Sequence, residues 1–117
     1  MPGIKISSKR LEKEVKQQIA ENLTTDLNRF LQVSTISVVF DEYEIIYVNG
    51  KESINNHITI SVEGPVTDNE KISEICAAFY NSVQRVINQP ESKISFVYHA
   101  NNRDHVGSNG VIHSMRK

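Results

Sequence analysis

Apolar and polar positions along the first part of the chain predict a strand followed by a long amphipathic helix. In "GIKIS", Ile4 and Ile6 alternate with polar neighbours, which is the period of a half-buried strand. Over residues 9–31, apolar side chains recur every three or four positions among Lys, Glu, Gln and Asn, as in a helix with one buried face. Ser7 or Ser8 is the expected N-cap, because a serine hydroxyl accepts a backbone N–H at a helix start.

The next segment predicts two strands and a turn. In "TISVVF", Ile36, Val38 and Phe40 alternate on one side of a strand. The β-rich stretch "YEIIYV" runs into Asn49-Gly50, a dipeptide that favours a tight hairpin turn. The first half of the chain therefore has the order β-α-β with an additional short strand.

The second half repeats this order. The stretches "HITISV" (57–62) and "KISFVYH" (93–99) alternate as strands, and an amphipathic helix is predicted between them over 72–87. Thr67 or Asp68 is the expected N-cap of that helix. The stretch "NQP" at 88–90 is expected to end it, because proline cannot continue a helix.

The two halves align as a structural repeat. Positions 36, 38 and 40 match 94, 96 and 98, and positions 4 and 6 match 60 and 62, so the offset is about 56 to 58 residues. We interpret the chain as one domain, 1–117, with repeat units at about 2–48 and 56–100 and a tail at 101–117. Two β-α-β units predict an α+β fold, in which a four-stranded sheet carries both helices on one face and the tail adds a short strand.

The other face of the predicted sheet is too apolar to lie in water. Val39, Val48 and Val97 alternate out of phase with the residues that face the helices. In the tail, "SNG" at Ser108–Gly110 precedes Val111-Ile112, which predicts a turn and a small strand able to extend a neighbour's sheet. We expect a homo-oligomer.

Composition excludes several classes of partner and cofactor. The 117 residues carry 13 Lys+Arg and 14 Asp+Glu, a net charge of −1, and no block of like charge that indicates nucleic acid. No apolar run approaches the roughly 20 residues of a membrane helix, and no signal-peptide pattern is present, so a soluble, cytoplasmic protein is expected. The four histidines and the single Cys76 have no zinc spacing; we expect no metal and no cofactor, and a buried Cys76.

Pro2 directly before a strand, the helix after it, the repeated β-α-β unit and "HVGSNGVIH" at 105–113 together resemble the tautomerase superfamily. The resemblance covers essentially the whole chain. The length is similar to the two-unit members, which include macrophage migration inhibitory factor and 5-(carboxymethyl)-2-hydroxymuconate isomerase. It implies a homotrimer whose sheets surround a central channel, and it implies that Pro2, once Met1 is removed, is the catalytic base.

The chemistry of such a base also follows from general principles. An α-amino group titrates near pH 8, and desolvation in an apolar cleft penalises its charged form, which leaves free base at neutral pH. A secondary amine of this kind takes a proton from carbon beside a carbonyl and returns it elsewhere. Addition of the same amine to a carbonyl or an activated alkene is the alternative, covalent mechanism.

An enolate oxygen and a substrate carboxylate also need donors, and here the sequence departs from the family pattern. Leu31 and Gln32 stand where inhibitory-factor-like members place a lysine, and Val97 aligns with their asparagine. The backbone N–H groups of Val62 and Glu63 are candidate donors by analogy with the corresponding strand of those members.

Two side chains are further candidates for substrate binding. Arg103 can clamp a carboxylate with two N–H groups, and the alternative is a solvated loop arginine paired with Asp104. The Tyr98 hydroxyl can donate, and the alternative is packing in the core beside Phe96. Lys5 is expected to face solvent or a subunit boundary.

Three functional hypotheses follow. The first is a tautomerase or isomerase that uses Pro2 as a general base on a small keto or enol acid, and the second is a non-catalytic trimeric binding or structural protein on the same scaffold. The third is a ferredoxin-like or RNA-recognition-type module, because β-α-β-β-α-β is also their order. No strand carries the aromatic cluster that stacks bases, so the third hypothesis is the weakest.

Overall fold

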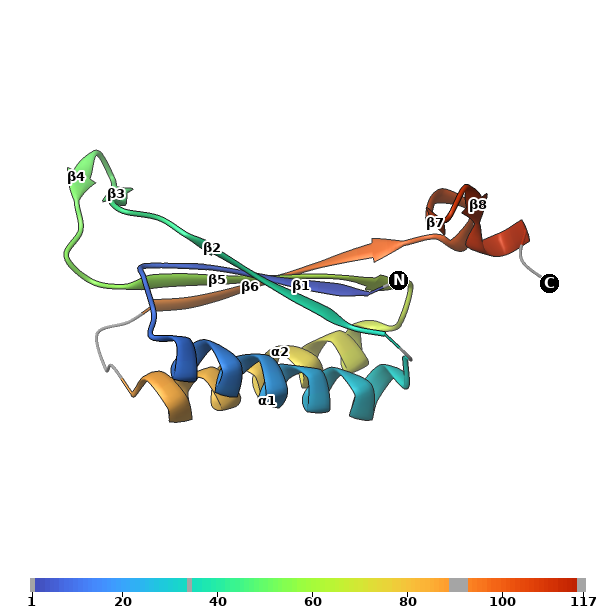
Figure 1. Ribbon diagram of the computed structural model, residues 1–117, viewed down its shortest axis with the longest axis horizontal. Helices are drawn as coiled ribbons and strands as arrows, with labels where there is room; N and C mark the ends of the chain where they lie inside the picture. The colour runs from blue at the N-terminus through green and yellow to red at the C-terminus, as the bar shows by residue number, and fades with distance from the viewer. Residues whose placement is uncertain (1, 34, 89–92, 116–117) are drawn as a thin grey trace.

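Two helices lie against one face of a four-stranded sheet, which confirms the predicted α+β class (Figure 1). A computed structural model describes residues 2–33, 35–88 and 93–115. The strand order is β2-β1-β5-β6. The strands are β1 (Gly3–Ser8), β2 (Ser37–Glu42), β5 (His57–Pro65) and β6 (Lys93–Asn101), and the helices are α1 (Lys13–Leu31) and α2 (Asn69–Ile87).

The strands of the two halves pair in matching registers, as the repeat in the sequence predicts. β1 pairs with β2 and β5 with β6, both in parallel, and β1 pairs with β5 in antiparallel. Ile4 lies beside Val38, and at the matching positions Ile60 lies beside Phe96. At the centre, Ile6 and Ile60 are direct partners. An approximate two-fold relation between the two β-α-β units follows from these registers.

The core lies between the sheet and the helices. The inward residues of the two central strands are at most 2% exposed, and burying a side chain of their size contributes about 1.5–3 kcal/mol each. Phe79 of α2 meets Phe96 of β6 edge-on, with ring centroids 6.0 Å apart. The fully buried apolar residues are Ile4, Ile6, Ile19, Leu23, Leu27, Ile58, Ile60, Val62, Ile75, Phe79 and Val83.

A buried polar pair joins the two helices. The Ser82 hydroxyl donates to Asp26 Oδ2 at 2.5 Å, and these residues are 56 positions apart, so they are equivalent in the repeat. Arg29 Nη2 lies 3.7 Å from the other carboxylate oxygen of Asp26. A buried carboxylate left without its donor costs on the order of 1–3 kcal/mol, so the pair fixes how α1 and α2 face each other.

The start of α1 differs from the prediction. Ser7 and Ser8 do not cap it, because both remain in β1, where Ser8 pairs with Glu42, and its hydroxyl donates to the Lys9 carbonyl at 2.8 Å. The helix begins only at Lys13, and its N-cap, Glu12, makes no side-chain capping bond.

The ends of α2 agree better with the prediction from the sequence than the start of α1 does. Asp68 caps its start as predicted, accepting the Lys71 N–H at 2.7 Å. Asn88 ends it in a left-handed conformation with φ of 50°, whereas Gln89 and Pro90 of the predicted stop lie outside the described residues. Cys76 on this helix is half-buried rather than buried.

In the part of the chain that is described, neither helix combines the length and apolar composition that a membrane span requires.

Two small hairpins rise from opposite ends of the sheet, on the side away from the helices (Figure 1). One is β3 (Tyr47–Val48) with β4 (Lys51–Glu52), and the other is β7 (Gly107–Ser108) with β8 (Val111–Ile112). Their loops are Asn49-Gly50 and Asn109-Gly110, all four residues at positive φ, as a two-residue hairpin turn requires. Both predicted turns are therefore confirmed. Short 3₁₀ turns, η1 (Arg103–His105) and η2 (His113–Met115), flank the second hairpin.

The sheet face opposite the helices is apolar, as its alternation predicts. Val39 of β2 and Val97 of β6 are 55% and 42% exposed. Val48, assigned to the same face from the sequence, lies instead in the first hairpin, where it is 38% exposed. Lys5 is exposed, with its ammonium nitrogen 3.4 Å from the Asp41 carboxylate.

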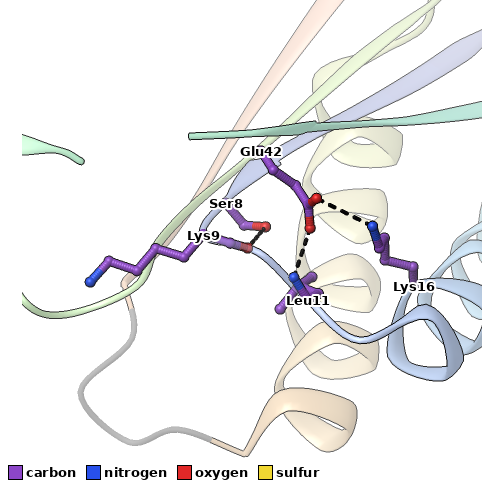
Figure 2. Close-up of polar contacts among 5 residues, drawn as sticks. All are labelled: Ser8, Lys9, Leu11, Lys16 and Glu42. Carbon is purple, nitrogen blue, oxygen red and sulfur yellow. Dashed lines mark hydrogen bonds and ion pairs between the residues drawn. The ribbon is translucent and has the colours of Figure 1, made fainter. Parts of the chain in front are cut away.

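Glu42 at the end of β2 holds the segment between β1 and α1 in place (Figure 2). Its Oε2 accepts the Leu11 N–H at 2.7 Å, and its Oε1 lies 3.3 Å from Lys16 Nζ. The backbone hydrogen bond from Leu11 is the main cause that lowers the pKa of Glu42 below its ordinary value; desolvation opposes it, and the Lys16 ammonium lowers the pKa further. The carboxylate thus anchors the segment just before the N-cap Glu12 and, through Lys16, the first turn of α1.

We expect Glu42→Gln to destabilise the protein at pH 7 and to have little effect at pH 3. The pKa of Glu42 is lower in the folded state, so its contribution is fully present above the unfolded-state value of about 4.3 and is lost as the pH falls through the folded value. Urea denaturation at both pH values measures the difference. Glu44→Gln is the matched control, since Glu44 makes no hydrogen bond or ion pair within the described chain; equal losses for the two variants would contradict the assignment.

Candidate active site

A cavity of about 630 Å³ opens at the end of the sheet where the chain begins. Four segments far apart in the sequence form its wall: the start of β1, the loop after α1, the end of β5 and the tail after β6. The lining residues are Pro2, Gln32, Val33, Thr35, Gly64, Pro65, Asn101, Arg103, Val106, Ser108 and His113.

The register of the central strands places Pro2 in this wall. The β1–β5 ladder ends with the pair Gly3 and Glu63, so Pro2 stands one step beyond it, in register with Gly64. Along β1 the even positions face the helices, and Pro2 is buried like Ile4. The same alternation that builds the core therefore turns Pro2 inward, at the point where the core ends and the cavity begins.

The loop after α1 contributes an amide where the resembled family has a cation. Gln32 ends the helix in a left-handed conformation with φ of 51°, and its N–H donates to the Asn28 carbonyl at 2.9 Å. This conformation directs the chain toward the cavity, where Gln32, Val33 and Thr35 lie on the wall.

Four of the lining residues come from the tail after β6, and backbone contacts hold its fold. Arg103 Nη2 donates to the His113 carbonyl at 3.1 Å, and the His113 N–H donates to the Val106 carbonyl at 2.7 Å. Within the described residues Arg103 forms no ion pair with Asp104, whose N–H instead donates to Asn102 Oδ1 at 2.9 Å. Arg103 is exposed, and four of its five N–H donors are not used in these contacts.

Electrostatics at the cavity favour an anion. Arg103 and His113 are the side chains on the described wall that carry or can acquire positive charge, and none of the lining residues is a carboxylate. A carboxylate-bearing ligand therefore meets attraction from the described wall and no carboxylate in it.

The other predicted site residues, Val62, Glu63 and Tyr98, do not line the cavity. Val62 is fully buried under the helices, and Glu63 is exposed between Gly3 and His99 of the adjoining strands. The Tyr98 hydroxyl donates to the Pro65 carbonyl at 2.6 Å, and burial raises the pKa of Tyr98 above its ordinary value. The cavity is lined by the next two residues of β5, Gly64 and Pro65, which sequence reasoning did not single out.

At the opposite end of β5, hydrogen-bonded side chains pack beside the ladder. The Tyr43 hydroxyl donates to the His57 carbonyl at 2.8 Å and accepts the His57 N–H at 2.9 Å. Asn56 is buried, and its Oδ1 accepts the Lys9 N–H at 3.0 Å. His57 Nε2 also lies 3.1 Å from Ser53 Oγ. Among the described residues, the two ends of an approximately symmetric unit thus differ: one holds this polar cluster and the other the cavity at Pro2.

No protein-family model and no curated protein matches the sequence, whereas solved structures match its fold closely. Pt0534 inactivated by 2-oxo-3-pentynoate matches with a TM-score of 0.84 and 17% identity, over 96% of this chain and 95% of that one. A fused 4-OT symmetric trimer, W0, matches at 0.82 with 15% identity, over 96% and 97% of the two chains.

Macrophage migration inhibitory factor of Toxoplasma gondii matches at 0.80 with 11% identity, over 94% of this chain and 98% of that one. The agreement extends over nearly the full length of each of these chains, so it is a likeness of the whole fold. The resemblance expected from Pro2, the repeated unit and the tail is thereby confirmed in three dimensions: the chain has the fold of the tautomerase superfamily.

Proposed function

We propose that this protein is a tautomerase or isomerase that uses Pro2 as a general base on a small keto or enol acid. One observation carries the proposal: Pro2 lies in the wall of a cavity of about 630 Å³ whose described lining contains a guanidinium and no carboxylate. The fold supports it, because tautomerase-superfamily proteins share this arrangement of strands and helices.

The base depends on removal of Met1. While Met1 is attached, the Pro2 nitrogen belongs to an amide and has no basic lone pair; once Met1 is removed, it is a secondary amine. An α-amino group titrates near pH 8 in water, and the buried position of Pro2 disfavours the charged form, so the pKa falls and free amine is present at neutral pH.

In the proposed reaction the amine takes a proton from carbon next to a carbonyl. The electron pair of the broken C–H bond forms the enolate, and the ammonium of Pro2 then returns the proton to a different atom, so no oxidant or cofactor is consumed. Arg103 binds the substrate carboxylate through N–H groups that the His113 carbonyl leaves unused. We assign the role of donor to the enolate oxygen to the side-chain amides of Gln32 and Asn101, which line the cavity, instead of the backbone N–H groups of Val62 and Glu63.

Covalent chemistry at the same amine is the alternative mechanism. A free secondary amine adds to an activated alkyne, and the neighbour Pt0534 is described as inactivated by 2-oxo-3-pentynoate. This compound is therefore a suitable probe of Pro2: a single adduct that maps to Pro2 by mass spectrometry indicates a free, nucleophilic amine whether or not the protein turns over a keto acid.

We expect the protein without Met1 to tautomerise phenylenolpyruvate or 2-hydroxymuconate, and Pro2→Ala to lower kcat by about 10²-fold, the smaller end of general-base effects. Stopped-flow absorbance measures the rate, and intact mass reports whether Met1 is absent. A form with Met1 retained is the matched control, because it keeps the proline ring but acylates its nitrogen; it should be inactive. Equal rates for all three proteins would reject Pro2 as the base.

Arg103→Ala is expected to raise KM for a carboxylate substrate by about 10- to 100-fold with a smaller change in kcat. A hydrogen bond to a charged group contributes about 1.5–3 kcal/mol, and this one is made before and during the reaction alike. Arg10→Ala, at an exposed arginine that does not line the cavity, removes the same charge and should leave KM unchanged. An Arg103 variant with wild-type KM would remove the carboxylate clamp from the proposal.

A non-catalytic trimeric scaffold is the second candidate function. The apolar sheet face at Val39 and Val97 favours it, since that face needs a covering subunit whether or not Pro2 is a base. Several neighbours are described as trimers, among them the fused 4-OT proteins. On this hypothesis the trimer persists in a protein that neither turns over substrate nor reacts with the alkyne probe.

We expect the protein to sediment as a trimer and Val97→Asp to reduce it to smaller species, because a carboxylate on a face buried between subunits is strongly unfavourable. Analytical ultracentrifugation measures the mass. Tyr80→Asp is the control, since Tyr80 is a similarly exposed apolar residue, at 48%, on the helical side of the molecule. A wild-type protein with the mass of one chain would contradict both the homotrimer and the scaffold hypothesis.

A further inference from the structure

A hydrogen bond from a residue outside the cavity holds the part of the wall next to Pro2. Tyr98 lies on β6, on the side of the sheet that faces the helices, and its hydroxyl donates to the Pro65 carbonyl at 2.6 Å. Tyr98 does not line the cavity, but Gly64 and Pro65 do. Pro65, the last residue of β5, already pairs with Asn101 in the β5–β6 ladder, and the Tyr98 bond adds a second, side-chain contact between these strands just before the turn into α2.

Gly64 allows this contact. A Cβ atom at Gly64 would lie 2.6 Å from the Tyr98 hydroxyl oxygen and 3.2 Å from the ring carbon that bears it. Any side chain at this position would push the phenol away from the Pro65 carbonyl. Gly64 also stands beside Pro2 across the β1–β5 ladder, so the glycine, the tyrosine ring above it and the proline form one layer at the end of the core.

We propose that Tyr98 is a positioning residue for Pro2: by holding Gly64 and Pro65 against the end of β1, it keeps the Pro2 nitrogen in a desolvated place on the cavity wall. This inference rests on the proposed function only in taking Pro2 as a free amine. The residue acts through the backbone of β5 and needs no contact with substrate.

Two properties of Tyr98 fit this role. Burial raises the pKa of its hydroxyl, which therefore remains a donor throughout the pH range in which an amine base titrates. The groups of the described wall that can also influence Pro2 by their charge, Arg103 and His113, both come from the tail, and Tyr98 contacts neither through a hydrogen bond of the described chain. A change at Tyr98 thus alters the solvation of Pro2 without removing a charged neighbour.

The test is the pKa of the Pro2 amine itself, measured by NMR titration of protein labelled with ¹³C-proline and freed of Met1. Tyr98→Phe removes one hydroxyl and keeps the ring. It is expected to raise the Pro2 pKa by about half a unit or more, toward the ordinary value of an α-amine, because water gains access to the nitrogen. The lower limb of the pH dependence of kcat/KM should move by the same amount between the wild-type enzyme and Tyr98→Phe.

Tyr43→Phe is the matched control. Tyr43 also binds the backbone of β5 through its hydroxyl, but at the opposite end of that strand, where it contacts His57. Its loss is expected to lower stability and to leave the Pro2 pKa unchanged. An unchanged pKa in Tyr98→Phe would overturn the proposal, and so would an equal shift in both variants, since that would indicate a general loosening of the fold.

Gly64→Ala tests the same layer from the other side. We expect it to raise the Pro2 pKa as Tyr98→Phe does, and the double variant to be shifted no further than the single ones, because both changes break one contact. Additive shifts would contradict a shared role. If the Pro2 pKa responds as expected but no keto acid is turned over, the positioning role stands and the proposed tautomerase activity fails.

Discussion

The antiparallel pairing of β1 with β5 is the constraint on which the rest of the structure depends. It joins the two β-α-β units, sets Ile6 against Ile60 at the centre of the core and, at its end, brings Pro2 beside Gly64. A slip of one residue would turn every inward side chain of β1 toward the opposite face of the sheet. The burial of Ile4 and Ile6 therefore fixes the position of Pro2 as well, and the stability of the core and the geometry of the site have the same origin.

The approximate symmetry of the two units is broken at their ends. Within the helical layer it is well kept: Asp26 and Ser82 face each other at equivalent positions, and Gln32 and Asn88 end their helices in the same left-handed conformation. At the ends of the sheet, the described residues around Tyr43 form a hydrogen-bonded cluster on one side, whereas a cavity lies at Pro2 on the other. A repeated architecture thus carries different side chains, and different polar groups, at its two corresponding ends.

Much of the fold was predictable from the sequence, because it depends on local periodicity. Alternation at Ile4 and Ile6 identifies a strand and its buried face, and the two Asn-Gly dipeptides identify hairpins. The start of α1 was not predictable in this way. Ser8 looks like a cap in the sequence, but its pairing with Glu42, a residue far along the chain, extends the strand through it.

The candidate site, like the fold, was predictable from the sequence only in part. Pro2 can be identified from the sequence because the proposed chemistry requires a proline directly after Met1. Val62 and Glu63, in contrast, precede the two residues of β5 that line the cavity, Gly64 and Pro65. A period of two tells which face a residue occupies, but it does not tell where along the strand the cavity opens. The bond of Tyr98 to the Pro65 carbonyl and that of Arg103 to the His113 carbonyl are side-chain contacts to backbone, and no residue pattern identifies the acceptor.

The groups around the cavity come from segments under different constraints. Pro2, Gly64 and the ring of Tyr98 belong to the sheet, where a change in size disturbs the core. Arg103 and His113 belong to an exposed tail that is held mainly by its own backbone hydrogen bonds, where side chains can change at little cost to folding. In the proposed reaction the base is therefore placed by the most constrained part of the molecule and the anion-binding group by the least constrained. Substrate preference can then diverge through the tail while the amine and its surroundings stay as the sheet sets them, so a shared fold at low sequence identity does not imply a shared substrate.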